Sequence, residues 1–341
     1  MGSKPAFLRS KAGAAVAVAP TAPNDAAVGR VRALLRDGHF WTNWTVVLAL
    51  GVLVIVFGSA SSVFLTGGNI NSVLDAAAIL AVLSVGQTFV VATAGIDLSI
   101  ASTLTLAAVM IGQFESHGWG VGWGTIAALA VGLAVGAGSG LVIAKGRITD
   151  FVVTLGALGV AQGLALVISA GQPVQVSSPA LLQLATGTFF SVHYTVLLAL
   201  ALALVGHAVL FYTPFGTHLF AIGGDAEAAR AMGIKVGRVK VAAYCISGLL
   251  AGVAGILLVA RIGSAQPAID TSYVLNSVAA VVLGGVSLFG GRGTIFGPIA
   301  GAVLLSALVN GLTLLSVSVF YQPIAVGLVV IASALLMRYG E

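Results

Sequence analysis

The chain is dominated by long apolar stretches that carry almost no charge and are separated by short polar segments. A helix needs about 20 predominantly apolar residues, with a range of roughly 17 to 25, to cross a bilayer. Only 7% of the residues are charged, against roughly 25% in soluble proteins. The sequence therefore predicts an all-α, polytopic membrane protein of about ten transmembrane helices, some broken or short. The expected spans are 45–64, 74–94, 98–114, 123–145, 151–170, 193–212, 241–262, 274–289, 294–316 and 320–337.

The positions of Lys and Arg indicate how these spans are oriented. With ten spans and a cytoplasmic N-terminus, every basic residue except Arg261 falls on the inner side. Because cytoplasmic loops are enriched in Lys and Arg, we expect both termini and the loop 213–240 to be cytoplasmic. An eight- or nine-span arrangement stays open, because 74–114 and 274–316 can contain re-entrant segments.

Two regions of different character make up the chain. Residues 1–40 form a polar, basic tail for which disorder is the default expectation. Its last part, 28–40, interleaves apolar and basic residues, as in a short helix lying on the membrane face. Residues 41–341 form the transmembrane domain.

The loop 213–240 is the longest polar insertion and predicts a short helix with both ends marked. Asp225 can cap the first free N–H groups, and Glu227 suits the positive end of the helix dipole. Gly233 can end the helix with a positive φ. A solvated loop helix and a docking element both fit this chemistry.

A few polar residues lie within or beside the apolar stretches. Asp97 can cap a helix that begins at Leu98, and an ionised carboxylate at mid-bilayer costs roughly 2.5–3.5 kcal/mol, so it needs partners. It serves either as a structural cap or as a contact for a solute. Polar side chains inside spans can line a path or join helices, the latter at about 0.6 kcal/mol each. The candidates for a translocation path are Gln87, Asp97, Ser99, Asn276, Phe289 and Asn310.

The segment 284–294 is rich in glycine, but the chain has no GxxxxGK[ST] motif, so we interpret it as a break between two membrane helices. The longer segment 277–301 weakly resembles the segment 76–102, because both run from an apolar stretch through small residues into a glycine break and a second helix. If each half holds five spans, the two halves are inverted repeats, as in many transporters. The histidines are scattered, so neither a catalytic nor a metal site is predicted.

Several motifs, taken in order, resemble one family. They are GIDLSIAS (95–102), FVVTLGALGVAQGLALVISAGQPV (151–174), TPFGTHLFAIGGDAEAARAMGIKV (213–236) and LNSVAAVVLGGVSLFGGRGTIFGPIAGAVL (275–304). The chain is similar to the membrane-spanning permease subunit of bacterial sugar ABC importers, the ribose/xylose/arabinose/galactoside group. Asp150 stands where that family usually has proline, and Gln162 where it usually has arginine.

The resemblance implies a permease in the bacterial inner membrane that carries a monosaccharide inward and is not itself an enzyme. ATP and Mg²⁺ would be bound by a cytoplasmic pair of ATPase subunits, and this chain would hold no cofactor. A periplasmic or lipid-anchored sugar-binding protein, a second permease copy and membrane lipid would be the other partners, with no nucleic acid. The residues implied for ATPase coupling are Gly224, Asp225, Glu227, Ala228, Ala229, Arg230 and Gly233.

Two alternatives stay open. The glycine-rich and acid-cap patterns are also found in ABC permeases for branched-chain amino acids or nucleosides. A secondary transporter driven by H⁺ or Na⁺ would need a buried acidic relay. The acidic residues closest to the spans, each at or near an end, are Asp75, Asp97, Glu115 and Asp150.

Overall fold

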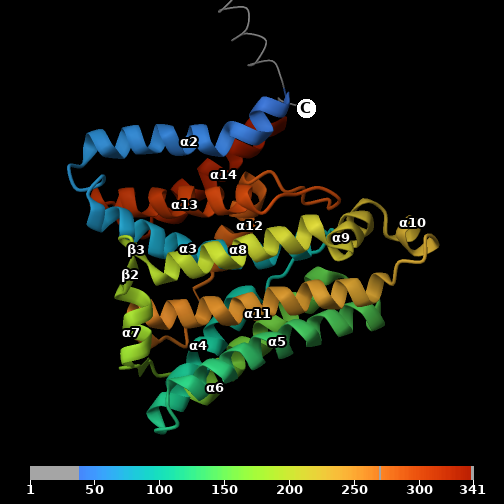
Figure 1. Ribbon diagram of the computed structural model, residues 1–341, viewed down its shortest axis with the longest axis horizontal. Helices are drawn as coiled ribbons and strands as arrows, with labels where there is room; N and C mark the ends of the chain where they lie inside the picture. Colours follow the sequence, from blue (N-terminus) through green and yellow to red (C-terminus); the bar gives the residue numbers. More distant parts are fainter. Residues whose placement is uncertain (1–37, 269, 339–341) are drawn as a thin grey trace, which may run out of the picture.

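The computed structural model describes residues 38–268 and 270–338, most of which are helical. Helices are the expected solution for apolar segments in lipid, because each backbone group must find its partner within the segment. The helices, labelled as in Figure 1, are α2 (Gly38–Ala60), α3 (Gly67–Val91), α4 (Ile100–Ser116), α5 (Val121–Gly146), α6 (Asp150–Ser169), α7 (Pro179–Thr186), α8 (Tyr194–Tyr212), α9 (Pro214–Gly224), α10 (Ala226–Ala231), α11 (Val236–Ile262), α12 (Ser272–Leu283), α13 (Phe296–Leu314) and α14 (Gln322–Arg338).

Each of the ten expected spans coincides with a helix. Among the described residues, α3, α5, α6, α8, α11 and α13 are long and apolar enough to cross a membrane. The other four spans coincide with shorter apolar helices: 46–60 of α2, α4, α12 and 322–332 of α14. The chain is thus a polytopic helical protein, and the count of ten crossings stays a prediction.

The helices α3 and α11 form the centre of the bundle. In its most apolar window α3 is 83% buried and α11 is 61% buried, whereas α5 and α6 are 33% and 22% buried. Figure 1 shows α2 at one side of the bundle and α6 at the opposite side, with α3, α8 and α11 between them. The main apolar cluster joins α3, α4, α8 and α11. The helices at the sides present most of their apolar surface outward, as lipid-facing helices do.

Glycines allow α5 and α11 to approach each other closely. Gly132, Gly136 and Gly140 lie four residues apart on one face of α5, and that face meets α11 at Tyr244 and Gly248. A Cβ on Gly136 would overlap the Tyr244 carbonyl, and one on Gly132 would overlap the Gly248 carbonyl. Small residues at such a contact let two helix backbones pack tightly.

Two ends of the bundle can be distinguished in Figure 1. At one end, which is also the end at which α2 begins, α9 and α10 project from the bundle. At the other end lie α7 and two short antiparallel pairs: β1 (Val174–Gln175) with β4 (Ser264–Ala265), and β2 (Thr188–Phe189) with β3 (Val192–His193). Neither pair was expected, because two-residue strands leave no periodic pattern in the sequence.

Several expected boundaries were wrong, among them the starts of α2 and α3, which lie at Gly38 and Gly67 and not at 45 and 74. The span expected at 274–289 ends at Leu283, because two glycines follow and Gly285 has a φ of +79°. The helix expected at 241 begins at Val236, so Arg238 and Lys240 lie in its first turns and not in a loop. The helix expected to begin at Leu98 begins at Ile100. The predicted basic tail lies outside the described residues, apart from 38–40.

Candidate functional site

A helical elbow is formed by α9 and α10 at the projecting end of the bundle. Pro214 occupies the first turn of α9, where its missing N–H costs nothing. The Asp225 carboxylate accepts from the backbone N–H of Glu227 at 2.8 Å and of Ala228 at 3.0 Å, which caps α10. Gly233 follows α10 with a φ of +85°. The short helix with marked ends is confirmed, whereas α9 was missed although Thr213-Pro214 is a helix-start signal.

The surface of α10 has an outer and an inner side. Ala228 is exposed and Met232 is 71% exposed, whereas Ala229 is 0% exposed and packs in the main apolar cluster. Its methyl group therefore faces the bundle and cannot contact another protein. The other residues implied for coupling are exposed: Gly224, Asp225, Glu227, Arg230 and Gly233.

Three glycine-containing turns meet directly beneath this elbow. A Cβ on Gly223 would overlap both the Ala92 carbonyl oxygen and the Gly291 nitrogen. One on Gly290 would lie 2.7 Å from the Ala94 nitrogen and 2.7 Å from the Gly223 Cα. The Gly291 N–H donates to the Ala92 carbonyl at 3.2 Å. The end of α9 is therefore in direct backbone contact with two other turns. We call this contact the glycine junction, made of 92–95, 223–224 and 290–291.

Asp97 follows the glycine junction and is buried between helices. Its carboxylate accepts from the Ser99 backbone N–H at 3.0 Å, the Ser99 hydroxyl at 2.6 Å and, on α11, the Ser247 hydroxyl at 2.7 Å. With its amide suitably oriented, Gln87 of α3 donates to the Asp97 carbonyl and accepts from its N–H, each at 3.2 Å. Burial raises the pKa of this loop carboxyl, against the hydrogen bonds, which lower it. The arrangement ties the loop to α3 and α11, so Asp97 acts as a structural brace.

A second acidic group, Asp150 at the start of α6, holds the same loop from outside. The Asp150 carboxylate accepts two hydrogen bonds from α11, one from the Lys240 ammonium at 3.0 Å and one from the Tyr244 hydroxyl at 3.0 Å. The Ile96 carbonyl accepts from the hydroxyl of Thr154 at 3.2 Å and from that of Tyr244 at 3.4 Å. The residue at which the chain departs from the usual proline therefore links α6 and α11 to the turn before Asp97.

We expect Asp150→Ala to lower the free energy of unfolding by about 1.5–3 kcal/mol, the usual range for hydrogen bonds to a charged group. The change leaves the Lys240 ammonium half-buried without its carboxylate. Thermal unfolding in detergent measures the effect, with Lys240→Ala and the double variant alongside. The double variant should lose less than the two single losses combined. Losses that simply add would show that the pair is not coupled.

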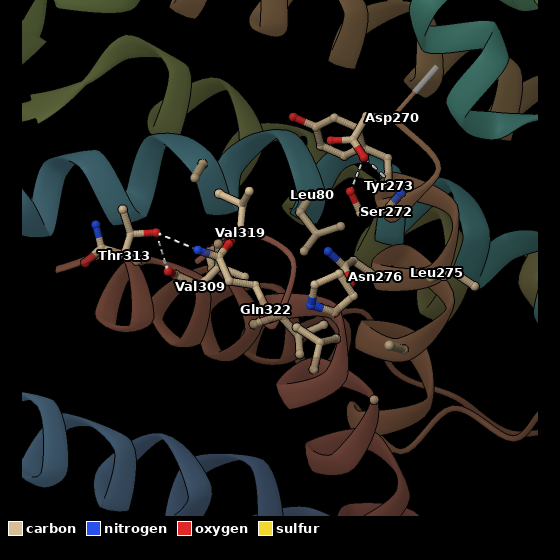
Figure 2. Close-up of a pocket in the computed structure, with 18 of the residues that line it drawn as sticks. Leu80, Asp270, Ser272, Tyr273, Leu275, Asn276, Val309, Thr313, Val319 and Gln322 are labelled. Carbon is tan, nitrogen blue, oxygen red and sulfur yellow. Dashed lines mark hydrogen bonds between the residues drawn. The ribbon is translucent and has the colours of Figure 1, made fainter. Parts of the chain in front are cut away.

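A cavity of about 810 Å³ lies between α3, α12, α13 and α14, toward the end opposite the elbow. Figure 2 shows Asp270, Tyr273 and Asn276 on one side of it, and Thr313 and Gln322 on the other. Leu80 of α3 and apolar residues of α13 and α14 complete the wall. A volume of this size is typical of ligand pockets, which range over roughly 300–1,000 Å³.

The candidate path residues fall into three separate places. Asn276 and Asn310 line the cavity. Gln87, Asp97 and Ser99 are at most 2% exposed and belong to the brace. Phe289 is 89% exposed in the loop that reaches the glycine junction. Four further polar residues of the wall were not predicted from the sequence, because they lie near helix ends, where polar residues are common: Asp270, Tyr273, Thr313 and Gln322.

The chain matches the protein family described as "Branched-chain amino acid transport system / permease component" over residues 69–336. It is 37% identical over 293 residues to the ribose import permease protein RbsC of Escherichia coli K12, covering 85% of this chain and 91% of the relative. It is 38% identical to RbsC of Bacillus subtilis 168, with the same coverage. No solved structure matches the chain.

Two further relatives carry other names. The L-arabinose ABC transporter permease protein AraH of Azospirillum brasilense is 31% identical over 326 residues, which covers 94% of each chain. The autoinducer 2 import system permease protein LsrC of Salmonella typhi is 32% identical and covers 84% of this chain and 83% of the relative. The similarity therefore extends over nearly all of the transmembrane domain.

Proposed function

Because the chain belongs to the branched-chain amino acid transport permease family, and within it resembles sugar ABC importers, we propose that it carries a monosaccharide into the bacterial cytoplasm. The observation that carries this proposal is the 37% identity to a ribose permease over 85% of the chain. The pentose relatives favour a pentose or hexose of similar size. Protein-bound ATP on another subunit would supply the energy, because the sequence has no nucleotide-binding motif.

We place the elbow in the cytoplasm and the cavity toward the outside. The distribution of Lys and Arg supports this orientation, because α10 lies at the end of the bundle at which α2 begins, after the basic N-terminal segment. The exposed side of α10 would dock in a cleft of an ATPase subunit, and a second copy of the permease would complete the pair. A periplasmic or lipid-anchored binding protein would deliver the sugar. The glycine junction would pass the ATPase movement to the turn before α4 and to the turn before α13.

A second candidate is an amino acid permease, which the description of the family supports. The cavity also has one basic and one acidic residue in its wall, Arg261 and Asp270, which could face a zwitterion. An ion-coupled carrier has less support, because Asp97 and Asp150 are held by fixed partners. Asp75 likewise accepts from Thr195 and pairs with His193, each within 2.7 Å.

We expect Ala228→Trp to leave the protein folded and inserted but to reduce ATP-driven uptake of D-ribose at least tenfold. The side chain is exposed on α10, so an indole fits without disturbing the bundle but separates the elbow from a docked subunit. The measurement is uptake into liposomes that contain the permease with its cognate ATPase and binding protein, with ATP hydrolysis recorded in parallel.

Ile55→Trp, at a 72% exposed position on α2, is the matched control and should transport normally. Normal uptake by Ala228→Trp would remove α10 as the coupling element. Uptake by the wild type that follows an ion gradient without ATP would overturn the importer proposal itself.

A further inference from the structure

The cavity between α3, α12, α13 and α14 divides into a charged part and an uncharged part. Among the described residues that line it, only two are charged: Arg261, at the end of α11, and Asp270, before α12. Asn276 lies within α12, after Asp270 in the chain, and is uncharged. The other polar residues further along the wall are also neutral: Ser306 and Thr313 of α13 and Gln322 of α14. The interior therefore offers hydroxyl and amide groups without a fixed charge, which suits a neutral, hydrogen-bonding solute.

Some polar side chains in the wall already have hydrogen-bond partners within the protein, and others do not. Asn310 exchanges two hydrogen bonds with Asn69, at 2.9 and 3.0 Å, and Gln322 donates to the Thr313 hydroxyl at 3.1 Å. Asn276 has no hydrogen-bond partner within the described part of the chain, although it is partly buried. In Figure 2 its amide lies beside Leu80, on the side of the cavity that α12 forms. An amide carries two donor hydrogens and an acceptor oxygen, which here are available to a ligand.

The cavity ends where α12 and α13 come together. A Cβ on Gly301 of α13 would lie 2.5 Å from the Ala280 carbonyl oxygen, and one on Gly284 would overlap the backbone at Gly297. Below this level Ala280 and Leu283 are also buried. The cavity is thus closed on the side of the glycine junction, as a solute site in one half of an alternating-access cycle must be.

We infer that this cavity is the monosaccharide site of the permease on the side away from the elbow, with Asn276 as its central recognition residue. This rests on the proposed sugar uptake. The Asn276 amide bonds two neighbouring hydroxyls of the sugar. The Tyr273 ring, one turn earlier on α12, covers an apolar C–H face. Leu80 forms the apolar wall.

The inference is tested with the full-length permease through the accessibility of single cysteines. Cys245, the only native cysteine, is changed to serine, and Ser306→Cys and Val278→Cys are made in that background, which leaves Asn276 in place. Ser306 of α13 lines the cavity, whereas Val278 of α12 does not. A membrane-impermeant maleimide should label the cysteine at 306 at least tenfold faster than that at 278. D-ribose at millimolar concentration should slow labelling at 306 at least threefold, and L-leucine should not.

A transport readout separates this inference from the proposed function. In the reconstituted importer, Asn276→Ala should reduce ATP-driven D-ribose uptake at least tenfold at an unchanged thermal midpoint, with Val278→Ala near wild type. Wild-type uptake together with normal uptake by Asn276→Ala, or labelling at 306 that D-ribose does not slow, would overturn the cavity inference alone. Protection by L-leucine alone would overturn it in favour of an amino acid. Absence of any wild-type uptake of D-ribose or L-arabinose would count against the proposed function.

Discussion

A permease that carries Gly136→Leu is expected to lose its folded state. The Cβ alone would overlap the Tyr244 carbonyl of α11, and three further carbon atoms would have to fit between two backbones in contact. Inserting methylenes into a packed interior lowers the free energy of unfolding by roughly 1–3 kcal/mol. We expect a loss at or above the upper end of that range here, because a backbone carbonyl cannot change rotamer to make room as a side chain can. The fraction of protein that elutes as a single species in detergent after heating measures the loss.

Gly138→Leu provides the matched control for this prediction. Gly138 lies two residues away on the same helix, is exposed, and has no atom within 4 Å of the position that a Cβ would take. Its replacement by leucine should be neutral or slightly stabilising, because leucine favours the helix over glycine by somewhat less than 1 kcal/mol. Equal loss in the two variants would mean that α5 and α11 do not pack through this face.

Features that depend on neighbouring residues could be predicted from the sequence. The apolar stretches located every long helix, because backbone pairing in lipid leaves little choice but a helix. The cap at Asp225 and the positive φ of Gly233 follow from residue types a few positions apart. The ends of helices were harder to predict. The helix α12 ends earlier than expected, at two glycines. At 236–240 nothing in the sequence distinguishes a polar loop from a helix that extends beyond the membrane.

Features that depend on distant residues could not be predicted. The glycine junction brings together three turns that lie far apart in the chain, and glycine content alone does not show which turns touch. Gln87 and Asn276 are both amides within apolar stretches, yet one holds the Asp97 loop and the other faces a cavity. The two roles differ because α3 and α12 pack differently against their neighbours, and this packing is not visible in the sequence.

Asp150 illustrates the same limit at a single position. Its departure from the family pattern was visible in the sequence, but its partner Lys240 lies 90 residues later. The pairing also explains why Lys240 is tolerated in the first turns of a membrane helix, since a half-buried ammonium needs a carboxylate beside it. The aspartate at position 150, where the family usually has proline, thus forms a contact between α6 and α11.

Gly223→Ala is expected to damage both stability and transport, because this position joins the elbow to the rest of the bundle. The added methyl would overlap the Ala92 carbonyl oxygen and the Gly291 nitrogen, so at least one of the three turns of the glycine junction must move. We expect a loss of about 1–3 kcal/mol in the free energy of unfolding and at least a tenfold loss of ATP-driven D-ribose uptake. Thermal unfolding and uptake by the reconstituted importer measure the two effects.

Gly224→Ala is the control for the stability part, since a Cβ there would meet no atom within 4 Å although the residue is adjacent in sequence. Its thermal midpoint should equal that of the wild type. If the elbow transmits movement through the junction, Gly223→Ala should uncouple: ATP hydrolysis by the docked subunits should continue while uptake falls. A variant that loses stability but keeps the wild-type ratio of sugar moved to ATP hydrolysed would show that the junction only holds the fold together.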